Sequence, residues 1–461
     1  MTTDGAGGLF GALFARGAAD TSDSAWLQAM LDTEAALARA AERAGLVPAG
    51  SGAAVTAVAS AEFFDNGSLA RAAAATGNPV PPLVRALTGL LPESAAPAAA
   101  AVHRGATSQD IIDTAAMLIA RRTLDTILAD LAVAASGCAA HAQTHAGTVM
   151  SGRTLLQQAV PVTFGLVAAG WLTALDEARL GLHRVRTTRL AVQFGGAAGT
   201  LAALGEVGPA VAGLLGEELG LPVPVLPWHT DRLRIIELAA ALAGACAALG
   251  KIARDITLLA QTEVAEVREA VAPGRGGSSV MPHKQNPVAS VLMLGCAKQA
   301  PGLLATLTAA AEQEHQRAAG AWHSEWQPLT QLLTLTASAA SWAADLLPAL
   351  QIDPAKMRAN LEATHGLPLA ENITNLLSPE LGRLQAHDLV AQASIRAAAD
   401  NITLADAIYS DERLAARLAE AAITRPELES ALKPESYLGA TPEFIRRALA
   451  AHADCESSLR R

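Results

Sequence analysis

Four long stretches with almost no proline constrain the fold of this chain more than any other feature. Residues 108–146 contain no proline, and residues 231–270 form a second proline-free run. A third run extends from Pro161 to about residue 190, and a fourth begins after Pro287. At about 1.5 Å per residue, a continuous helix over the first run would be roughly 55 to 60 Å long. The fourth run is expected to kink at Pro301, because proline removes a backbone donor there.

The composition supports long helices that pack against one another. Hydrophobic residues make up 51% of the chain and aromatic residues only 3%, so the apolar mass consists mainly of small and aliphatic side chains. This balance favours close-packed helices over sheets. Helices of this length need a partner along the whole apolar side, which predicts an all-α fold built on a long helix bundle. Faces left exposed in one subunit are expected to pack against other subunits.

Proline and glycine divide the chain into three expected helical domains. Residues 24–44 carry apolar positions at three- and four-residue spacing, typical of an amphipathic helix, and prolines then recur up to residue 97. Proline, glycine and polar residues return after Ile352. We therefore expect an N-terminal helical domain over residues 1–105, a central long-helix bundle over 106–352 and a C-terminal helical domain over 353–461.

Charge and cysteine content narrow the partners and the compartment. The formal net charge of −10 argues against a nucleic-acid partner, because no basic stripe offsets the acidity. The four cysteines lie far apart and form no CxxC pair, so we expect neither a zinc site nor a disulfide framework. No basic leader and no uninterrupted apolar stretch of about 18 residues stands out. We expect a cytoplasmic protein that uses no membrane, metal or cofactor.

The segment richest in chemistry is residues 274–287, GRGGSSVMPHKQNP. It fits neither a P-loop nor a dinucleotide-binding fingerprint, because its glycines and lysine are spaced differently from both. A serine here can act as a base if the glycine-rich backbone and Lys284 stabilise its alkoxide, and Asn286 can donate to a carboxylate. The alternative is a surface loop without chemistry. We expect a mobile loop that closes over an anion.

Three further polar segments lie near the ends of the expected helices. In residues 103–110, HRGATSQD, Thr107 or Ser108 can cap the first long helix, whose N-terminus offers a carboxylate site; plain capping is the alternative. Residues 152–161, GRTLLQQAVP, are expected to be a loop that opens a helix. Residues 314–326 concentrate histidine, arginine and tryptophan, and Arg317 there is a candidate for meeting an anion.

Together these segments resemble the fumarase/aspartase superfamily. Its members share a GSSxMPxKxNP loop, matched here by residues 277–287, and a TSxDxxDT segment, matched by residues 107–114. The similarity extends over nearly the whole chain, and the loop signature is highly specific. The resemblance implies a long central helix bundle, a homotetramer in which the bundles pack together, and active sites assembled from three subunits.

The resemblance also implies roles for individual residues. Ser278 would be the acid and base of the loop, and Lys284 would hold a substrate carboxylate beside it. The expected substrate-binding residues are Thr107, Ser108, Gln157, Ser279, Asn286 and Arg317. The implied substrate is a small tricarboxylate, and no metal or cofactor is implied.

One departure from the superfamily pattern narrows the chemistry. Members that expel an amine or water commonly carry histidine directly after the threonine that corresponds to Thr154. This chain has Leu155 at that position. The chain looks most like lactonising members, in which an ionised substrate carboxylate adds to a conjugated double bond. We therefore expect an intramolecular cyclisation in aromatic-compound breakdown, with Ser278 delivering the one proton. Two alternatives stay open: a lyase that releases fumarate from an adenylosuccinate-like or nitrosuccinate-like substrate, and a structural protein without activity.

Overall fold

The computed structural model describes residues 8–270, 276–277, 281, 283–420 and 422–460. The chain clusters into two compact units that alternate along the sequence. The first unit is made of residues 1–132, 177–251 and 291–344, and the second of residues 133–176, 252–290 and 345–461. The three domains expected from the sequence stay a prediction.

Helices dominate the regular structure, which confirms the predicted all-α class. The α-helices are α1 Gly8–Gly11, α2 Asp23–Arg43, α3 Ser51–Val58, α4 Asn66–Thr76, α5 Val80–Gly89, α6 Ser108–Thr144, α7 Phe164–Thr188, α8 Gly208–Leu219, α9 Leu233–Leu259, α10 Val288–Ala309, α11 Ala321–Leu346, α12 Pro354–Glu362, α13 Ala370–Leu381, α14 Arg383–Asp400, α15 Leu404–Tyr409, α16 Glu412–Glu420, α17 Arg425–Ala431 and α18 Thr441–Leu459. The strands are β1 Val149–Thr154, β2 Gln157–Thr163, β3 Val267–Arg268 and β4 Gln351–Ile352.

The predicted long runs correspond to long helices whose ends differ in detail. The helix α6 occupies the first run, as expected, and α10 extends through Pro301 without ending there. The helix α9 ends at Leu259, earlier than the proline-free run, and the chain then makes turns and enters β3. Absence of proline therefore predicted where helices lie better than where they stop.

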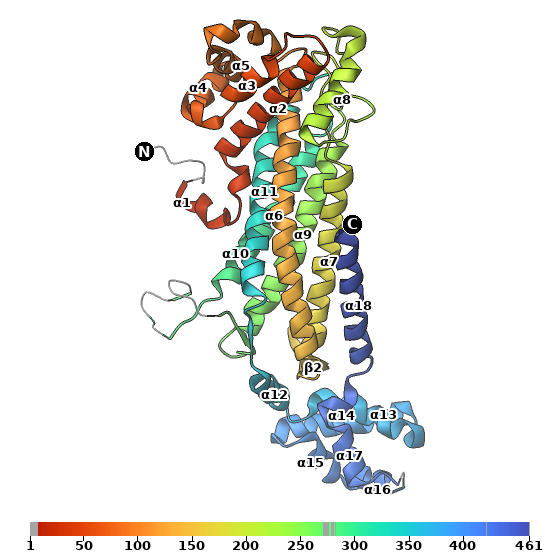
Figure 1. Ribbon diagram of the computed structural model, residues 1–461. Helices are drawn as coiled ribbons and strands as arrows, with labels where there is room; N and C mark the ends of the chain where they lie inside the picture. The colour runs from red at the N-terminus through yellow and green to blue at the C-terminus, as the bar shows by residue number, and fades with distance from the viewer. Residues whose placement is uncertain (1–7, 271–275, 278–280, 282, 421, 461) are drawn as a thin grey trace. The chain divides into compact units, whose positions relative to one another are not determined.

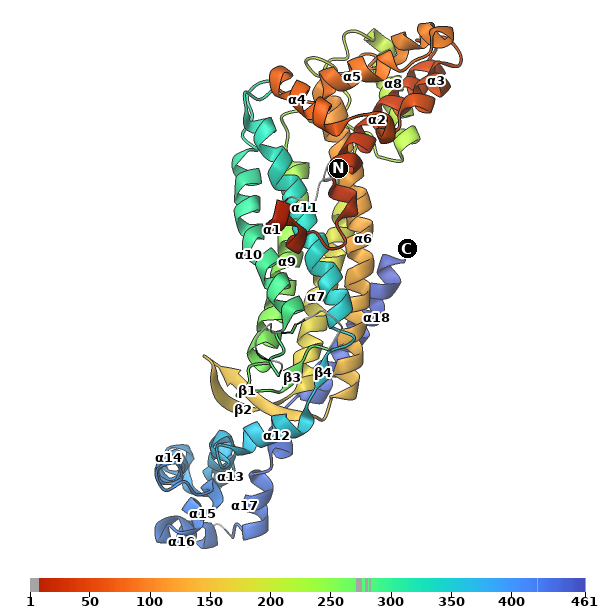
Figure 2. The same ribbon diagram turned by 90° about the vertical axis from the view of Figure 1, so that its left-hand side faces the viewer.

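The first unit combines the N-terminal helices with a bundle of long helices. Ser22 caps α2 by accepting the amide of Ala25 at 3.2 Å. The helix α2 then packs against α3 and α8. Parts of α6, α9, α10 and α11 lie side by side in both views (Figures 1 and 2). Their inner faces bury aliphatic residues such as Ile119, Leu242 and Leu332.

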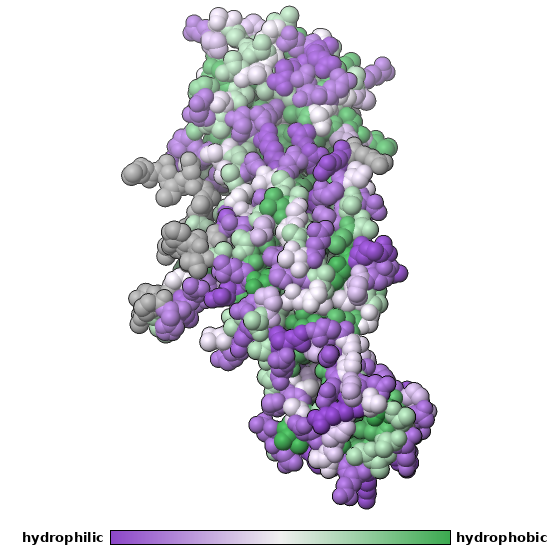
Figure 3. Space-filling view, turned by 60° about the horizontal axis from the view of Figure 1, so that its bottom comes forward, coloured by the Kyte–Doolittle hydropathy of each residue, from purple (hydrophilic) through white to green (hydrophobic). Residues whose placement is uncertain are grey.

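Three helices are long and apolar enough to cross a membrane by length and composition alone, namely α6, α9 and α10. In α6 and α9 the most apolar window is 44% and 50% buried, whereas in α10 it is 28% buried. Hydrophobic side chains reach the surface of the chain, where they are coloured green in Figure 3. The apolar window of α10 therefore has the smallest buried share of the three.

In the second unit a short hairpin replaces the expected loop-to-helix junction. Strands β1 and β2 pair antiparallel, with Thr154 opposite Gln157, and α7 begins only at Phe164. The prediction of a loop at residues 152–161 was therefore wrong, whereas the helix expected after it is present as α7. The turn consists of Leu155 and Leu156, with φ of 52° and 66°. A two-residue hairpin turn of this type normally carries Asn-Gly, so the two leucines gave no turn signal.

The C-terminal helices of the second unit surround a core of their own. Helices α13, α14 and α15 pack in sequence, and α13 also contacts α17. The core is formed by twelve buried residues: Ile373, Leu377, Ala386, Val390, Ala393, Ala397, Leu404, Ala407, Ile408, Leu414, Leu418 and Leu428. Strand β4 pairs with β3 through Val267 and Ile352, so the short helix α12 starts directly beside the segment that leads to residues 274–287.

Candidate active site

The described part of the glycine-rich loop is closed at its base. The backbone N–H of Asn286 donates to the carbonyl of Gly276 at 2.9 Å, and Gly277 forms an isolated antiparallel bridge with Gln285. Gly276 has a φ of 76°, and a Cβ added there would lie 2.9 Å from the carbonyl oxygen of Asn286. Glycine is therefore required at this position. The base of the loop holds Asn286 next to Gly276.

Predicted loop residues differ in how far the structure describes them. Ser278 and Ser279 lie outside the described residues. The side chain of Lys284 is exposed, and Asn286 is half-buried. Neither side chain has a hydrogen-bond or ion-pair partner among the residues that the structure describes.

Glu269 fixes the point where the loop passes into α10. Its carboxylate accepts the amides of Ala289 and Ser290 at 3.1 and 2.9 Å, and also the Ser290 hydroxyl at 2.7 Å. These amides belong to the first turn of α10, where no carbonyl within the helix can accept them. The carboxylate also suits the positive end of the helix dipole. Glu269 thereby joins the segment before the loop to the helix after it.

The N-terminus of α6 presents two free hydroxyl groups. Thr107 and Ser108 are half-buried, and neither hydroxyl has a hydrogen-bond partner within the described ranges. Asp110, at the third helical position, accepts the amide of Thr107 at 3.0 Å. This is half of a capping box, in which the acidic residue holds the backbone just before the helix. The hydroxyls stay available at a helix end that favours anions.

Asp110 connects this helix end to two distant segments. Besides Thr107, its carboxylate accepts the amides of Gly195 and Gly196 at 3.0 and 2.9 Å, and it lies 2.7 Å from Nε2 of His229. Asp110 is 1% exposed and His229 is 4% exposed. A buried carboxylate needs this number of donors, because each unmade bond would leave a desolvated charge. Asp110 therefore sets the backbone of residues 195–196 against the start of α6.

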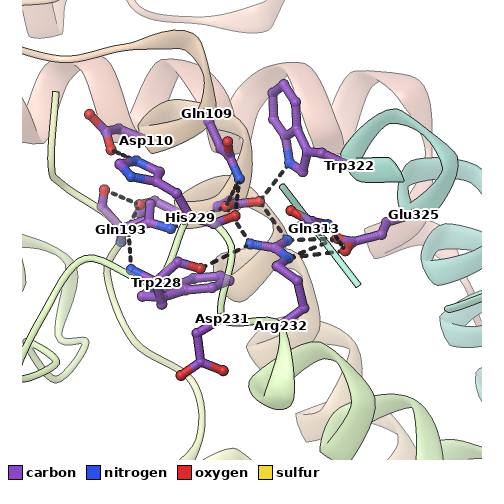
Figure 4. Close-up of polar contacts among 12 residues, drawn as sticks. Gln109, Asp110, Gln193, Trp228, His229, Asp231, Arg232, Gln313, Trp322 and Glu325 are labelled. Carbon is purple, nitrogen blue, oxygen red and sulfur yellow. Dashed lines mark hydrogen bonds and ion pairs between the residues drawn. The ribbon is translucent and has the colours of Figure 1, made fainter. Parts of the chain in front are cut away.

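A second acidic residue, one helical turn further on, anchors a buried ion cluster. Asp113 accepts two bonds from the guanidinium of Arg232, at 2.8 and 3.0 Å, and one from the indole of Trp322 at 3.0 Å. Arg232 also pairs with Glu325 at 2.6 Å (Figure 4). Burial raises the pKa of Glu325, although the charge of Arg232 opposes this. One cation shared by two carboxylates ties α6 and α11 to the residue that precedes α9.

Arg317 is held by protein acceptors. It donates from Nη1 to Oε1 of Gln109 at 2.8 Å and from Nε to the carbonyl of Ala197 at 3.2 Å, and Nη2 reaches the carbonyls of Gly196 and Ala197. Burial lowers the pKa of Arg317, and the charges of Asp110 and Asp113 partly offset this. Its charge thus lies beside Gln109, the residue that follows Ser108. Nη1 carries two hydrogens, and one of them has no acceptor among the residues that the structure describes.

Gln157 lies at the start of β2, next to the exposed hairpin turn. Its side chain is exposed, whereas the neighbouring Gln158 bonds to the C-terminal region through the carbonyl of Asn360 at 3.0 Å. Leu155 and Leu156 are 97% and 73% exposed. Gln157, Lys284 and Asn286 belong to the second unit, and Thr107, Ser108 and Arg317 belong to the first.

Sequence reasoning missed the buried partners that hold these residues in place. The missed residues are Gln109, Gln193, His229, Arg232, Glu269 and Glu325. A signal existed in α6, because polar residues at positions 109, 110, 113 and 114 occupy one side of the first turns of the helix, and residues 111, 112 and 115–120 are apolar. Such residues are buried only with partners. Their long-range partners lie 79 or more positions away, and periodicity cannot identify them.

Comparison with known proteins gives the family of the chain. A family model described as a lyase matches residues 16–302, and a model of the adenylosuccinate lyase C-terminus matches residues 366–448. The first match covers more than half of the chain. The chain belongs to the fumarase/aspartase superfamily. The resemblance noted in the sequence is thereby confirmed.

Individual members of the superfamily are similar over almost their whole length. A 3-carboxy-cis,cis-muconate cycloisomerase of Bradyrhizobium diazoefficiens is 48% identical over 93% of this chain and 94% of the relative. A nitrosuccinate lyase of Streptomyces davaonensis is 45% identical over 94% of this chain and 91% of the relative. The crystal structure of a 3-carboxy-cis,cis-muconate lactonizing enzyme from Pseudomonas putida superposes with a TM-score of 0.91 and 44% identity, covering 97% of this chain and 99% of that one.

Proposed function

We propose that this protein converts 3-carboxy-cis,cis-muconate to a carboxymuconolactone, as a cytoplasmic step in protocatechuate breakdown. The main support is the similarity to relatives that carry this name, at 48% and 46% identity over more than nine tenths of the chain. The loop signature, with Ser278, Lys284 and Asn286 intact, supports a working enzyme over a structural protein.

In the proposed reaction a substrate carboxylate oxygen attacks the conjugated double bond. The new C–O bond closes the lactone ring, and the electron pair of the double bond moves onto the carbon beside a second carboxylate. The resulting enolate-like charge is stabilised by Lys284 and Asn286. Ser278 then gives its proton to that carbon and regains one from water. The attacking carboxylate is already ionised, so no acid or base is needed at its oxygen.

The described geometry supports a carboxylate subsite at the start of α6. Thr107 and Ser108 offer two hydroxyl donors, and the helix end adds free backbone amides and a favourable dipole. Arg317 supplies a positive charge near Gln109 without being pulled away by an acidic partner. Together with Ser279 and Gln157, these groups are proposed to hold the carboxylates of the tricarboxylate substrate.

Exposed apolar surface supports a homotetramer with active sites shared between subunits. The hairpin turn exposes Leu155 and Leu156, and α10 exposes Val291 at 53%. Exposed apolar side chains next to one another, as in the hairpin turn, are a common feature of surfaces that bind another protein. In the proposed assembly the hairpin and α10 pack against other copies, and Gln157 reaches a neighbouring site.

An ultraviolet assay with a serine variant tests the proposal. Purified protein should remove the conjugated diene absorbance of 3-carboxy-cis,cis-muconate, and Ser278→Ala should lose at least about a hundredfold in kcat, the size expected for a lost acid–base group. Ser458→Ala, which changes an exposed serine of α18, is the matched control and should keep full activity. Near-normal turnover by a folded Ser278→Ala variant would disprove the assigned role.

A lyase that releases fumarate from a substituted succinate is the second candidate. The nitrosuccinate lyase relative, at 45% identity, favours this alternative, and a good leaving group such as nitrite needs no proton either. Growth of fumarate absorbance from nitrosuccinate or adenylosuccinate, without loss of diene absorbance from the muconate, would select the lyase. Activity on neither class of substrate would support the alternative of a structural protein without activity.

A further inference from the structure

A cavity in the second unit is not lined by any residue that the proposed reaction uses. It lies among α12, α15, α17 and the short 3-10 helices η6 Leu367–Leu369 and η7 Pro434–Tyr437, and it encloses about 590 Å³. This volume falls within the range of roughly 300 to 1,000 Å³ that is typical of small-molecule sites. Its wall includes the aliphatic side chains of Leu361, Leu369 and Leu432.

The rim of the cavity carries one cation, Lys433, whose side chain has no hydrogen bond or ion pair with the residues that the structure describes, although its charge acts on Glu435. Arg358 pairs with Glu435 and lies 3.7 Å from Glu362, so its charge is neutralised. The side chain of Lys433 is exposed. An anionic group on a ligand would find its partner in Lys433.

The acidic residues of the rim limit how much negative charge the cavity accepts. Glu362, Glu429 and Glu435 all line it, of which Glu362 and Glu435 share Arg358, and Glu429 pairs with Arg425. Lys433 can match one anionic group, and further carboxylates would meet these acidic side chains, so a molecule with three carboxylates is disfavoured here. Aliphatic walls, the Lys433 cation and acidic neighbours together select an organic acid with an apolar body and a single anionic group. The proposed tricarboxylate substrate does not fit this description.

The wall of the cavity is joined to the hairpin of the second unit. Strand β2 packs against η6 and η7. Gln158 donates to the carbonyl of Asn360 at 3.0 Å, and Thr364 donates to Oε1 of Gln158 at 3.3 Å. These bonds connect the C-terminal part of α12 to the strand that begins with Gln157.

A buried ion pair extends this connection to the segment before the glycine-rich loop. Asn360 donates from Nδ2 to Glu266 at 2.9 Å, and Glu266 is fully buried. Glu266 accepts two bonds from Arg153 of β1, at 2.9 and 2.6 Å. Breaking a buried pair of this kind is strongly destabilising, so the hairpin and the cavity wall are expected to move together.

We propose that this cavity is a second binding site, which takes an organic monoanion with an aromatic or aliphatic body and stiffens the hairpin when it is occupied. The binding itself is independent of the proposed reaction. An effect on turnover rests on the proposed function, because it acts through the hairpin that carries Gln157.

Fluorescence titration of the full chain with 8-anilinonaphthalene-1-sulfonate tests the site. Lys433→Gln should weaken the saturable binding by about threefold or more, because an opposite charge is lost at a partly exposed position. Ala405→Trp, which fills the cavity from α15, should abolish that component. Lys356→Gln removes a lysine of α12 that does not line the cavity and should change nothing.

Competition and hydrogen exchange complete the test. Citrate at matched ionic strength should not displace the probe, because it carries three carboxylates. Amide exchange in residues 149–163 should slow when the probe binds to the wild-type chain but not to Lys433→Gln. Equal probe affinity in all folded variants would overturn the site, and unchanged exchange in the hairpin would overturn the coupling. Neither readout requires catalysis, so both are separate from a failure of the proposed function.

Discussion

Asp110→Asn is the substitution that most directly tests how the start of α6 is held. One carboxylate oxygen accepts the amides of Thr107 and Gly196, and the other accepts Gly195 and faces Nε2 of His229. An amide group replaces one of these oxygens by a donor. In either orientation, at least one buried backbone N–H loses its acceptor, and two lose it in one of them.

The expected cost follows from this count. An unpaired buried donor costs about 1 to 3 kcal/mol, so Asp110→Asn, which leaves at least one, should weaken the local structure by about 1 to 3 kcal/mol or more. At about 1.4 kcal/mol for each factor of ten, amide exchange at Gly195 or Gly196 should accelerate by about fivefold or more. Hydrogen exchange with mass spectrometry on a peptide that spans residues 193–200 measures this directly.

Asp125→Asn is the matched control on the same helix. Asp125 pairs with Arg186, and its side chain is 51% exposed. A surface pair contributes about 1 kcal/mol or less, so exchange near residues 193–200 should stay at the wild-type rate. If Asp110→Asn changed the exchange of Gly195 and Gly196 by less than about threefold, the buried carboxylate would not be the anchor described above.

Three further predictions concern the segments around the site. Burial lowers the pKa of His103, but its hydrogen bond to Glu34 and the charge of that carboxylate raise it above the usual value. The stabilisation from this histidine should be complete below about pH 6.5 and lost as pH rises through the folded pKa. The difference in Tm between wild type and His103→Asn should therefore shrink from about pH 6 to about pH 9. A constant difference would contradict this. Glu269→Gln should lower the free energy of unfolding by about 1 kcal/mol and raise KM. The exposed Glu263→Gln is the control. An unchanged melting temperature and KM in Glu269→Gln would contradict the capping role. Gly105→Ala should destabilise by about 1 to 3 kcal/mol in thermal melts, because φ is 74° and the new Cβ would lie 2.6 to 2.8 Å from Leu204; adding Leu204→Ala should restore only the part due to the clash.

Much of the fold was predictable because it depends on local rules. Proline-free apolar runs located α6, α7, α9 and α10, since a helix needs only its own backbone bonds to continue. The hairpin of β1 and β2 was not predictable in the same way. Its turn uses two leucines where Asn or Gly is usual, and it is fixed by pairing and by contacts to α12.

The candidate site divides along the same line. The loop signature and the residues at the start of α6 stand as contiguous motifs, so Lys284, Asn286, Thr107 and Ser108 could be named from the sequence. The residues that hold them in place come from elsewhere in the chain. His229 meets Asp110 across 119 positions, a pairing that depends on how the helices pack. No local pattern contains that information.

The two leucines of the hairpin turn also bear on how this sequence was selected. Each L-residue in the left-handed region costs roughly 1 to 2 kcal/mol, and both side chains are left in water in the single chain. Replacing the two leucines by Asn-Gly would reduce the backbone cost and remove the exposed apolar side chains. A chain under selection for the stability of the isolated subunit alone would be expected to lose these leucines. Their presence indicates selection on the assembled protein proposed above. The turn is therefore a position at which a substitution can raise the stability of the monomer while it weakens assembly.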